Sequence, residues 1–293
     1  AFYGVLKSMD GYIKFAMLTG VTKFGKVSVF SDLNNLDDIS MRQIYVDLCG
    51  ISEQELHDNL ESELHELADA QGVTYDEICK KLRDYYDGYH FTYNSIGIYN
   101  PFSLFNAFVG KNYENFWFST GTPTFLIELL KQSQFDIREL DNTTATAEQF
   151  DAPTNVITDP IPVLYQSAYL TIKGYDPDFE LYTLAYPNKE VRKGFIESLM
   201  PAYVHLPARE NTFYVMSFIK DLRVGNIGSC LERMRSFFAS IPNQNNKEEK
   251  HYQTIFYLLF RLMGQNVDVE VNTAIGRADA VVKMQNAILC FRI

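Results

Sequence analysis

The chain has 293 residues, of which 46% are hydrophobic, and a formal net charge of −11. This composition is not that of a disordered polypeptide, and it suffices for one large core or two to three smaller ones. The acidic balance argues against bulk attraction to nucleic acid but leaves room for a local basic surface. The four cysteines are scattered, and no apolar run approaches the roughly 20 residues of a membrane span. We therefore expect a cytoplasmic protein with reduced, buried cysteines.

Both ends of the sequence lie inside patterned segments. Phe2, Val5 and Met9 have helical spacing, which predicts the end of an amphipathic helix over residues 1–12. The last residues, Ala287–Ile293, form an apolar run with no turn after it. We expect the chain to be a fragment of a larger protein.

A short apolar run at Ile13–Leu18 predicts a buried strand. After it, Gly20–Lys26 matches the G-x4-G-K spacing of a phosphate loop. Such a loop needs a Ser or Thr hydroxyl directly after the lysine to hold magnesium, and here that position is Val27. The residues that follow are β-branched and poor in helix formers. A strand-to-loop junction is the better interpretation, and a nucleotide cradle is the weaker alternative.

Helix signals begin at Ser52, which has the spacing of a capping box with Glu55. They predict one helix to about Ala70, ended by Gly72, and a second over Thr74–Tyr86. Further helices are predicted at Phe102–Val109, Thr122–Lys131, 189–204, 212–223 and 226–239.

The middle of the chain has the outline of a winged-helix module. A helix is predicted over Pro162–Leu170, followed by a hairpin of Leu170–Tyr175 and Glu180–Leu184. Residues 132–160 are rich in Thr, Asn and Asp, which predicts loops. Residues 240–250 form the clearest linker.

After the linker, a strongly apolar helix is predicted at His251–Met263. Three strand-like segments follow it. They are Val267–Val271, Ala278–Val282 and Ala287–Phe291.

Several sequence blocks, in order along nearly the whole chain, together resemble one bacterial family, in which an AAA-ATPase-like domain is fused to a C-terminal nuclease domain of the PD-(D/E)xK type. The blocks are Phe2–Lys7, Phe15–Phe24, Val27–Ser40, Tyr86–Tyr89, Tyr99–Ser103, Trp117–Thr124, Leu164–Thr171, Ala185–Arg192, Tyr252–Gln253 and Gly276–Val281. The resemblance implies a mostly helical, multidomain α/β chain. Residues 1–48 would end a P-loop ATPase core, 49–240 would form a helical lid with a winged-helix-like unit, and 247–293 would begin a restriction-endonuclease-like domain.

The same resemblance implies that the true phosphate loop lies upstream of the first block, so ATP would bind only in the full-length protein. Thr19 would be a sensor-like residue near the γ-phosphate. A threonine hydroxyl that bonds only to the backbone is the alternative for this position.

Metal-dependent phosphodiester cleavage needs carboxylates that converge on one cation. The resemblance assigns Asp279 as the second-strand acid and Mg²⁺ ligand, with turn chemistry as the alternative. Glu249 would be the first-helix acid, or else a solvated acid favoured by the helix dipole. Arg277 would contact nucleic acid. Glu270 alternates with two valines and is expected on the solvent side.

The third strand departs from the family pattern. The resemblance places Arg292 where the acid of the acid-x-Lys pair belongs, and an arginine repels magnesium instead of binding it. Two functions follow. The full-length protein would couple ATP to Mg²⁺-dependent nucleic-acid processing, with DNA the expected partner and a nuclease site that has partly degenerated. Alternatively, it would be a non-catalytic scaffold that binds nucleic acid or protein. ATP hydrolysis through Gly20–Lys26 alone is a third, weaker hypothesis.

Overall fold

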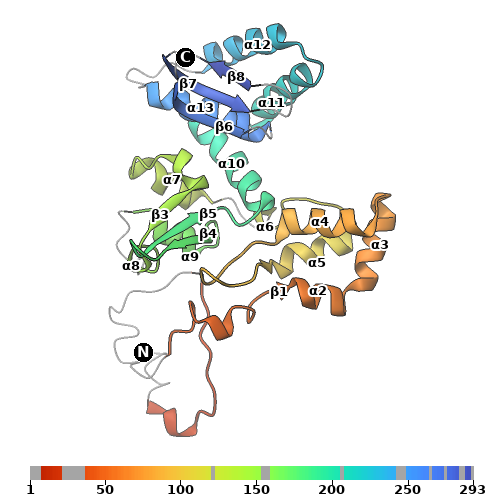
Figure 1. Cartoon of the computed structure of the whole chain (residues 1–293), viewed down its shortest axis with the longest axis vertical. Helices are drawn as coiled ribbons and strands as arrows, with labels where there is room; N and C mark the ends of the chain where they lie inside the picture. Colours follow the sequence, from red (N-terminus) through yellow and green to blue (C-terminus); the bar gives the residue numbers. More distant parts are fainter. Residues whose placement is uncertain are drawn as a thin grey trace. The chain divides into compact units, whose positions relative to one another are not determined.

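The computed structural model describes residues 8–21, 37–119, 123–152, 159–204, 208–241, 249–263, 266–273, 276–283 and 288–291 (Figure 1). The fold is mostly helical with small antiparallel sheets, as the sequence predicts. Contacts divide the chain into two compact units, Ala1–Arg192 and Lys193–Ile293. The predicted domain limits near residues 48 and 240 stay predictions, because they rest on a family resemblance and not on compactness.

The predicted N-terminal strand is wrong. The described part of this region holds only a short 3-10 helix, η1 (Asp10–Tyr12), and residues 13–20 have no helix or strand. Phe15 is 81% exposed, although the apolar run predicted burial. A strand is stable only when another strand pairs with it, and no described residue pairs with this run. The rest of the Gly20–Lys26 match lies mainly outside the described residues.

Four helices form the first core. They are α2 (Glu53–Asn59), α3 (Glu61–Gln71), α4 (Tyr75–Tyr86) and α5 (Pro101–Gly110), preceded by the short η2 (Gln43–Tyr45). The predicted capping box is present: the Glu55 backbone N–H donates to Ser52 Oγ over 3.2 Å, and the Ser52 N–H donates to Glu55 Oε2 over 2.9 Å. Thr74 and Glu77 form an equivalent box at the start of α4.

The single helix predicted up to Ala70 is two helices. The chain leaves helical geometry at Leu60, with φ −128° and ψ 23°, and re-enters it at once. This change of direction lets both Leu56 and Leu64 join one fully buried core. Gly72 ends α3 in the left-handed region, with φ 64°, a conformation that favours glycine.

A pair of short antiparallel strands also belongs to this helical region. Strand β1 (Ile51–Ser52) pairs antiparallel with β2 (Ile98–Tyr99), which leads into α5. Asn100 caps α5 by accepting from the backbone N–H of Phe102 over 3.0 Å. The short α6 (Phe116–Ser119) follows.

A three-stranded sheet lies in the next part of the first unit. Its strands are β3 (Thr143–Ala145), β4 (Thr171–Asp176) and β5 (Leu181–Ala185), in the order β3-β5-β4. The predicted hairpin is confirmed as β4 and β5. Helix α7 (Thr124–Gln132) precedes the sheet, and α9 (Ile161–Gln166) ends earlier than predicted, where Ala168 adopts a φ of 63°.

The prediction of loops over residues 132–160 is wrong in part. This stretch holds η3 (Ile137–Asp141), β3 and α8 (Ala147–Phe150). Polar residues dominate its composition, but Ile137, Leu140 and Phe150 are buried. Strand β3 forms because it pairs with β5, which is distant in the sequence, so local sequence alone did not indicate it.

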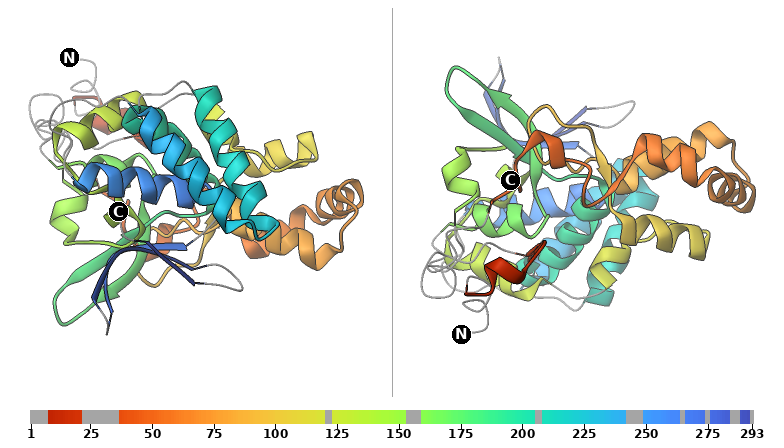
Figure 2. Two further views of the ribbon diagram at one scale, coloured as in Figure 1. Left: turned by 90° about the horizontal axis from the view of Figure 1, so that it is seen from above. Right: turned by 90° about the horizontal axis from the view of Figure 1, so that it is seen from below.

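In the second unit, α10 (Lys189–Val204) begins before the unit boundary and leads to α11 (Ala208–Arg223) and α12 (Ile227–Ser240). The last two lie side by side in the views of Figures 1 and 2. Gly225 turns the chain between them with a φ of 72°. An ion pair of 2.8 Å joins Arg233 to Asp221 across this pair of helices.

The C-terminal segment consists of one helix and a three-stranded antiparallel sheet (Figure 1). Its elements are α13 (Glu249–Leu262), β6 (Asn266–Thr273), β7 (Gly276–Lys283) and β8 (Ile288–Phe291). This confirms the predicted helix and three strands. Residues 253–260 of α13 are all buried, and the helix contacts β6 and β7.

Candidate functional site

The backbone register of the C-terminal sheet places the candidate acid. Strand β7 lies in the centre of the sheet, between β6 and β8. Asp279 is the fourth residue of β7, inside the ladder and not at its mouth as predicted. The ladder is longer than expected because Gly276 already pairs with Thr273. Asp279 therefore lies inside the strand, and its role as a metal ligand stays a prediction.

The other predicted residues occupy the same helix and sheet. Arg277 pairs with Asn272, and it lies two residues before Asp279, on the same face of β7. Glu249 is the first residue of α13, as predicted for the first-helix acid. Arg292 lies outside the described residues.

The register also brings an additional acid beside Asp279. Val269 pairs with Ala280 and Val271 pairs with Ala278, so Glu270 stands directly opposite Asp279. The predicted solvent-side position of Glu270 stays a prediction, and alternation alone did not indicate which residue of the neighbouring strand would lie opposite it.

The two faces of the sheet differ in chemistry. By register, one face of the ladder holds Asn266, Asp268, Glu270, Asn272, Arg277, Asp279 and Lys283 together with Val281, Ile288 and Cys290, whereas the other holds Val267, Val269, Val271, Thr273, Ala278, Ala280, Val282, Leu289 and Phe291. Because strand positions alternate between faces with a period of two, the charged positions of β6 and β7 share one face, which β8 continues with apolar positions.

Charge is divided unequally between the two units. Residues 1–192 contain 14 basic and 28 acidic residues, whereas residues 193–293 contain 12 basic and 9 acidic ones. The strong acidity of the chain therefore belongs to its first unit. A polyanion such as DNA would be repelled by that unit far more than by the second.

Thr19, the predicted sensor, lies exposed in the segment without regular structure. Its role stays a prediction. Of the cysteines, Cys79 and Cys230 are buried as predicted, whereas Cys49 is exposed.

A second polar cluster lies in the first unit, where several of the sequence blocks meet. Glu190, at the start of α10, is fully buried. Its Oε1 accepts from the Ser103 hydroxyl and from the Trp117 backbone N–H, each over 2.9 Å. Its Oε2 has no partner of hydrogen-bond geometry in the described part of the chain. Burial raises the pKa of this carboxyl, although these two donors and the backbone N–H of Phe116 act to lower it.

Two further contacts tie the same blocks together. The Thr171 hydroxyl donates to the His90 carbonyl over 2.9 Å and accepts from the His90 N–H over 2.8 Å. Lys173 donates to the carbonyls of Gly88 and Pro187 over 2.7 and 3.0 Å, and burial lowers its pKa to about 8. Lys173 occupies a β-bulge between Ile172 and Gly174, which redirects the side chain of the extra residue. This cluster joins segments that are distant in the sequence, and Lys173 itself is exposed.

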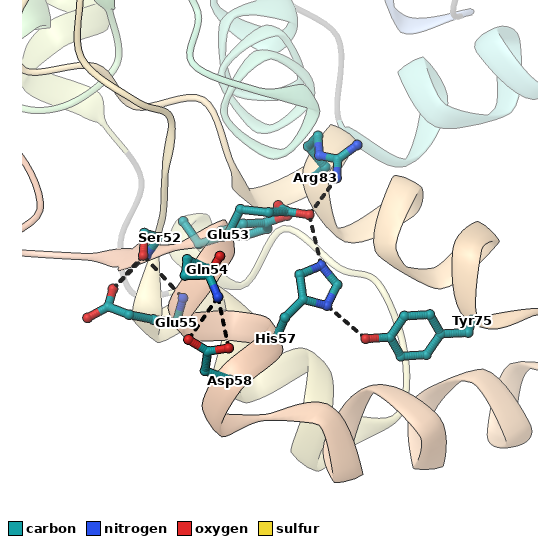
Figure 3. A network of polar contacts seen from close by, with 9 residues as sticks. Ser52, Glu53, Gln54, Glu55, His57, Asp58, Tyr75 and Arg83 are labelled. Carbon is teal, nitrogen blue, oxygen red and sulfur yellow. Dashed lines mark hydrogen bonds and ion pairs between the residues drawn. The ribbon is translucent and has the colours of Figure 1, made fainter.

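A third network joins α2 to α4 (Figure 3). The Glu53 carboxylate accepts from Arg83 and from the Tyr99 hydroxyl, each over 2.5 Å, and contacts His57 Nε2 at 3.2 Å. Burial alone would raise the pKa of Glu53, but the bonds from Arg83 and Tyr99 hold it below its ordinary value. His57 Nδ1 contacts the Tyr75 hydroxyl at 2.8 Å. Arg83, Glu53, His57 and Tyr75 thus form a continuous chain of contacts between α2 and α4, and we interpret this network as structural.

Among the side chains that the structure describes, no three His, Cys, Asp or Glu residues gather closely enough to hold a metal ion. The side chains of β6, β7 and β8 are not among them. No described helix is both long and apolar enough to cross a membrane.

Comparison with known proteins identifies this C-terminal segment. Residues 247–291 match the family model of the PD-(D/E)XK nuclease superfamily. By this match, the C-terminal segment is similar to PD-(D/E)XK nuclease superfamily domains. The match includes Glu249, Glu270, Arg277 and Asp279, and it ends one residue before Arg292.

A longer relative covers the rest of the chain. The chain is 36% identical, over 301 aligned positions, to an Azotobacter chroococcum mcd 1 protein described as "uncharacterized protein in vnfD 5′region". The alignment takes in 99% of this chain but 55% of the relative, so the chain spans about half of that protein's length. No solved structure matches the chain significantly.

Proposed function

We propose that the chain belongs to an ATP-linked nucleic-acid-processing protein, in which the PD-(D/E)XK domain cuts DNA with the help of Mg²⁺. One observation carries the proposal: Asp279 lies in the central strand of an antiparallel sheet that contacts α13, within the residues that match the nuclease superfamily.

The acids of this domain suit a hard divalent cation, which prefers carboxylate oxygens. Asp279 would hold the Mg²⁺, with Glu249 as the first-helix acid. The register supports this donor chemistry, because the flanking pairs Val269↔Ala280 and Val271↔Ala278 put a second acidic residue, Glu270, opposite Asp279 in the ladder. A bound Mg²⁺ supplies Lewis-acid activation of water and neutralises charge on the phosphate.

Arg277 supports a role in holding the nucleic acid. It lies on the same face of β7 as Asp279, where a guanidinium can donate two parallel hydrogen bonds to a phosphate. The more basic balance of the second unit also favours nucleic-acid contact there.

The ATP-linked part of the proposal rests on the sequence blocks of the first unit. Thr19 would approach a nucleotide bound by other parts of the full-length protein. The Azotobacter relative, which extends beyond the aligned chain, is compatible with such parts.

Cleavage assays of the intact protein test the nuclease proposal. With Mg²⁺ and labelled DNA, the wild type should cut and Asp279→Ala should lose about 100-fold or more of the rate, because the charge stabilisation by the cation is lost. Asp268→Ala, on the same face of the sheet, is a matched control that should retain activity. Absence of cleavage by the wild type, or equal cleavage by Asp279→Ala, would defeat the proposal.

A non-catalytic scaffold is the second candidate, and the middle region of the chain favours it. The strand order β3-β5-β4, with α8 and α9 between β3 and β4, supports the winged-helix-like assignment. However, residues 124–185 hold three basic and ten acidic residues, and Phe179 at the hairpin tip is 73% exposed. An acidic wing with an exposed aromatic ring suits a protein partner better than DNA.

Gel shifts with labelled duplex at several salt concentrations distinguish the two candidates. DNA binding through phosphates must weaken as salt rises. Binding that is absent or independent of salt, together with absent cleavage, would favour the scaffold.

A further inference from the structure

Two buried polar atoms at the start of α10 lack partners among the described residues. Asn188 caps this helix, because the Val191 backbone N–H donates to its Oδ1 over 3.1 Å. The Nδ2 atom of the same amide is buried and has no partner of hydrogen-bond geometry in that part of the chain. Two residues later, Glu190 Oε1 accepts from Ser103 and Trp117, but the buried Oε2 accepts from neither. One donor and one acceptor are therefore left over at this helix start.

The segment that contains Tyr89 packs against the residues just before α10. An antiparallel bridge to Ile98 fixes the Tyr89 backbone through hydrogen bonds of 3.0 and 3.3 Å. The adjoining Gly88 lies so close to Pro187 that a Cβ atom at Gly88 would be 2.4 Å from the Pro187 carbonyl oxygen. The Tyr89 hydroxyl oxygen is buried, and no described group has hydrogen-bond geometry to it. It is a third polar atom in need of a partner.

Electrostatic interactions place these groups near one another. Burial raises the pKa of Tyr89, and the charge of Glu190 raises it further, whereas the amides of Asn100 and Asn188 act to lower it. Each of these effects requires that the group lie near the phenol. Neither amide has hydrogen-bond geometry to the hydroxyl oxygen, so the proximity does not amount to a direct bond.

The chemistry of the three atoms is complementary to a small neutral molecule. A carboxylate oxygen accepts a hydrogen bond, an amide Nδ2 donates one, and a phenol does both. Buried polar groups in folded proteins almost always have a hydrogen-bond partner, because an unsatisfied one loses its hydration without compensation. A buried water molecule typically makes about three hydrogen bonds to groups of this kind. A metal cation suits the site poorly, because an amide N–H repels it.

We propose that one buried water molecule bridges Glu190 Oε2, Tyr89 Oη and Asn188 Nδ2. It would join the sequence blocks Tyr86–Tyr89 and Ala185–Arg192 by a polar contact in the interior of the first unit. The inference is independent of the proposed nuclease function, because it concerns residues of the first unit alone.

A high-resolution crystal structure of the full chain tests the proposal directly. It should show an ordered water molecule within about 2.5–3.2 Å of all three atoms. A direct hydrogen bond between the Tyr89 hydroxyl and Glu190 Oε2, with no water between them, would overturn the proposal.

Magnetic relaxation dispersion of the solvent tests it in solution, because this measurement counts the water molecules that a protein holds for long times. The double variant Tyr89→Phe with Asn188→Ser removes two of the three partners, and serine keeps an oxygen that can cap α10. It should hold one water molecule fewer than the wild type. Tyr93→Phe is the control, since Tyr93 is 54% exposed, and its count should equal that of the wild type. Equal counts for the wild type and the double variant would refute the bridge.

Urea denaturation of single variants gives a readout that does not need the double variant to fold. Tyr89→Phe keeps the ring but removes one partner of the water, so it should raise the unfolding equilibrium constant roughly tenfold. Tyr93→Phe removes the hydroxyl of an exposed tyrosine and should change this constant by less than about twofold. Equal effects of the two substitutions would count against the proposal.

Discussion

At the scale of single residues, burial decides the properties of Glu190. A fully buried carboxylate is costly unless hydrogen bonds satisfy it, and only one of its oxygens has partners of good geometry in the described part of the chain. Its donors come from α5 and α6, far from residue 190 in the sequence. The side chain therefore links three elements, and its ionisation is coupled to folding.

This coupling predicts opposite effects for two substitutions. Glu190→Ala should lower the unfolding free energy by about 2–4 kcal/mol, because buried donors lose their acceptor. Glu190→Gln keeps an acceptor and removes the buried charge, so it should be tolerated near neutral pH. Urea denaturation of both variants at one pH would show the difference, and equal losses would contradict it.

The raised pKa of Glu190 also predicts a pH dependence. A carboxyl that binds its proton more tightly in the folded state stabilises the fold at low pH, and this contribution is lost as pH rises through the folded pKa. As the pH rises from 4.5, the ordinary pKa of a glutamate, through the raised pKa of the folded state, the wild type should therefore lose unfolding free energy relative to Glu190→Gln. If the unfolding free energies of the wild type and Glu190→Gln change with pH by the same amount, the prediction is contradicted.

At the scale of elements, local sequence sets where the helices begin. The boxes Ser52–Glu55 and Thr74–Glu77 each satisfy two backbone or side-chain donors within four residues. Such short-range chemistry is visible in the sequence. The break between α2 and α3 at Leu60 is not visible in the sequence. It depends on tertiary packing, in which Leu56 and Leu64 are buried in the same core.

The cap of α4 gives a direct test of this local contribution. Thr74→Ala should lower the unfolding free energy by about 1 kcal/mol, because the Glu77 N–H loses its acceptor. Thr74→Ser keeps the hydroxyl and should be close to the wild type. Chemical denaturation measures both, and a neutral Thr74→Ala would show that water replaces the cap.

At the scale of the whole molecule, the division of charge decides where a polyanion can bind. The first unit has twice as many acidic as basic residues, whereas basic residues are in excess in the second. The overall charge of −11 hides this difference. Composition is a sum over the chain, but the electrostatic field that a ligand meets depends on which residues fold together.

This division of charge predicts which basic side chain contributes to DNA binding. Arg277→Ala should weaken binding and lower the slope of log K against log salt by about one, the expectation for one lost phosphate contact. Lys80→Ala, on the exposed surface of α4 in the acidic unit, should leave the slope unchanged. Fluorescence anisotropy at several salt concentrations measures both slopes. A larger effect of Lys80 would place the DNA on the first unit.

By itself, the sequence determined the capped helices, the hairpin at residues 171–185, and the helix with three strands that ends the chain. Their signals are local, because capping and alternation act over a few residues. Local pattern failed at Ile13–Leu18 and over 132–160, because a strand exists only when another strand pairs with it.

Only the tertiary structure decided which distant residues meet. Ser103, Trp117 and Glu190 converge through packing, and strand register aligns the residues of β6 with those of β7. Sequence patterns give the period of each element but not its alignment with a neighbour, because that alignment depends on burying whole faces together.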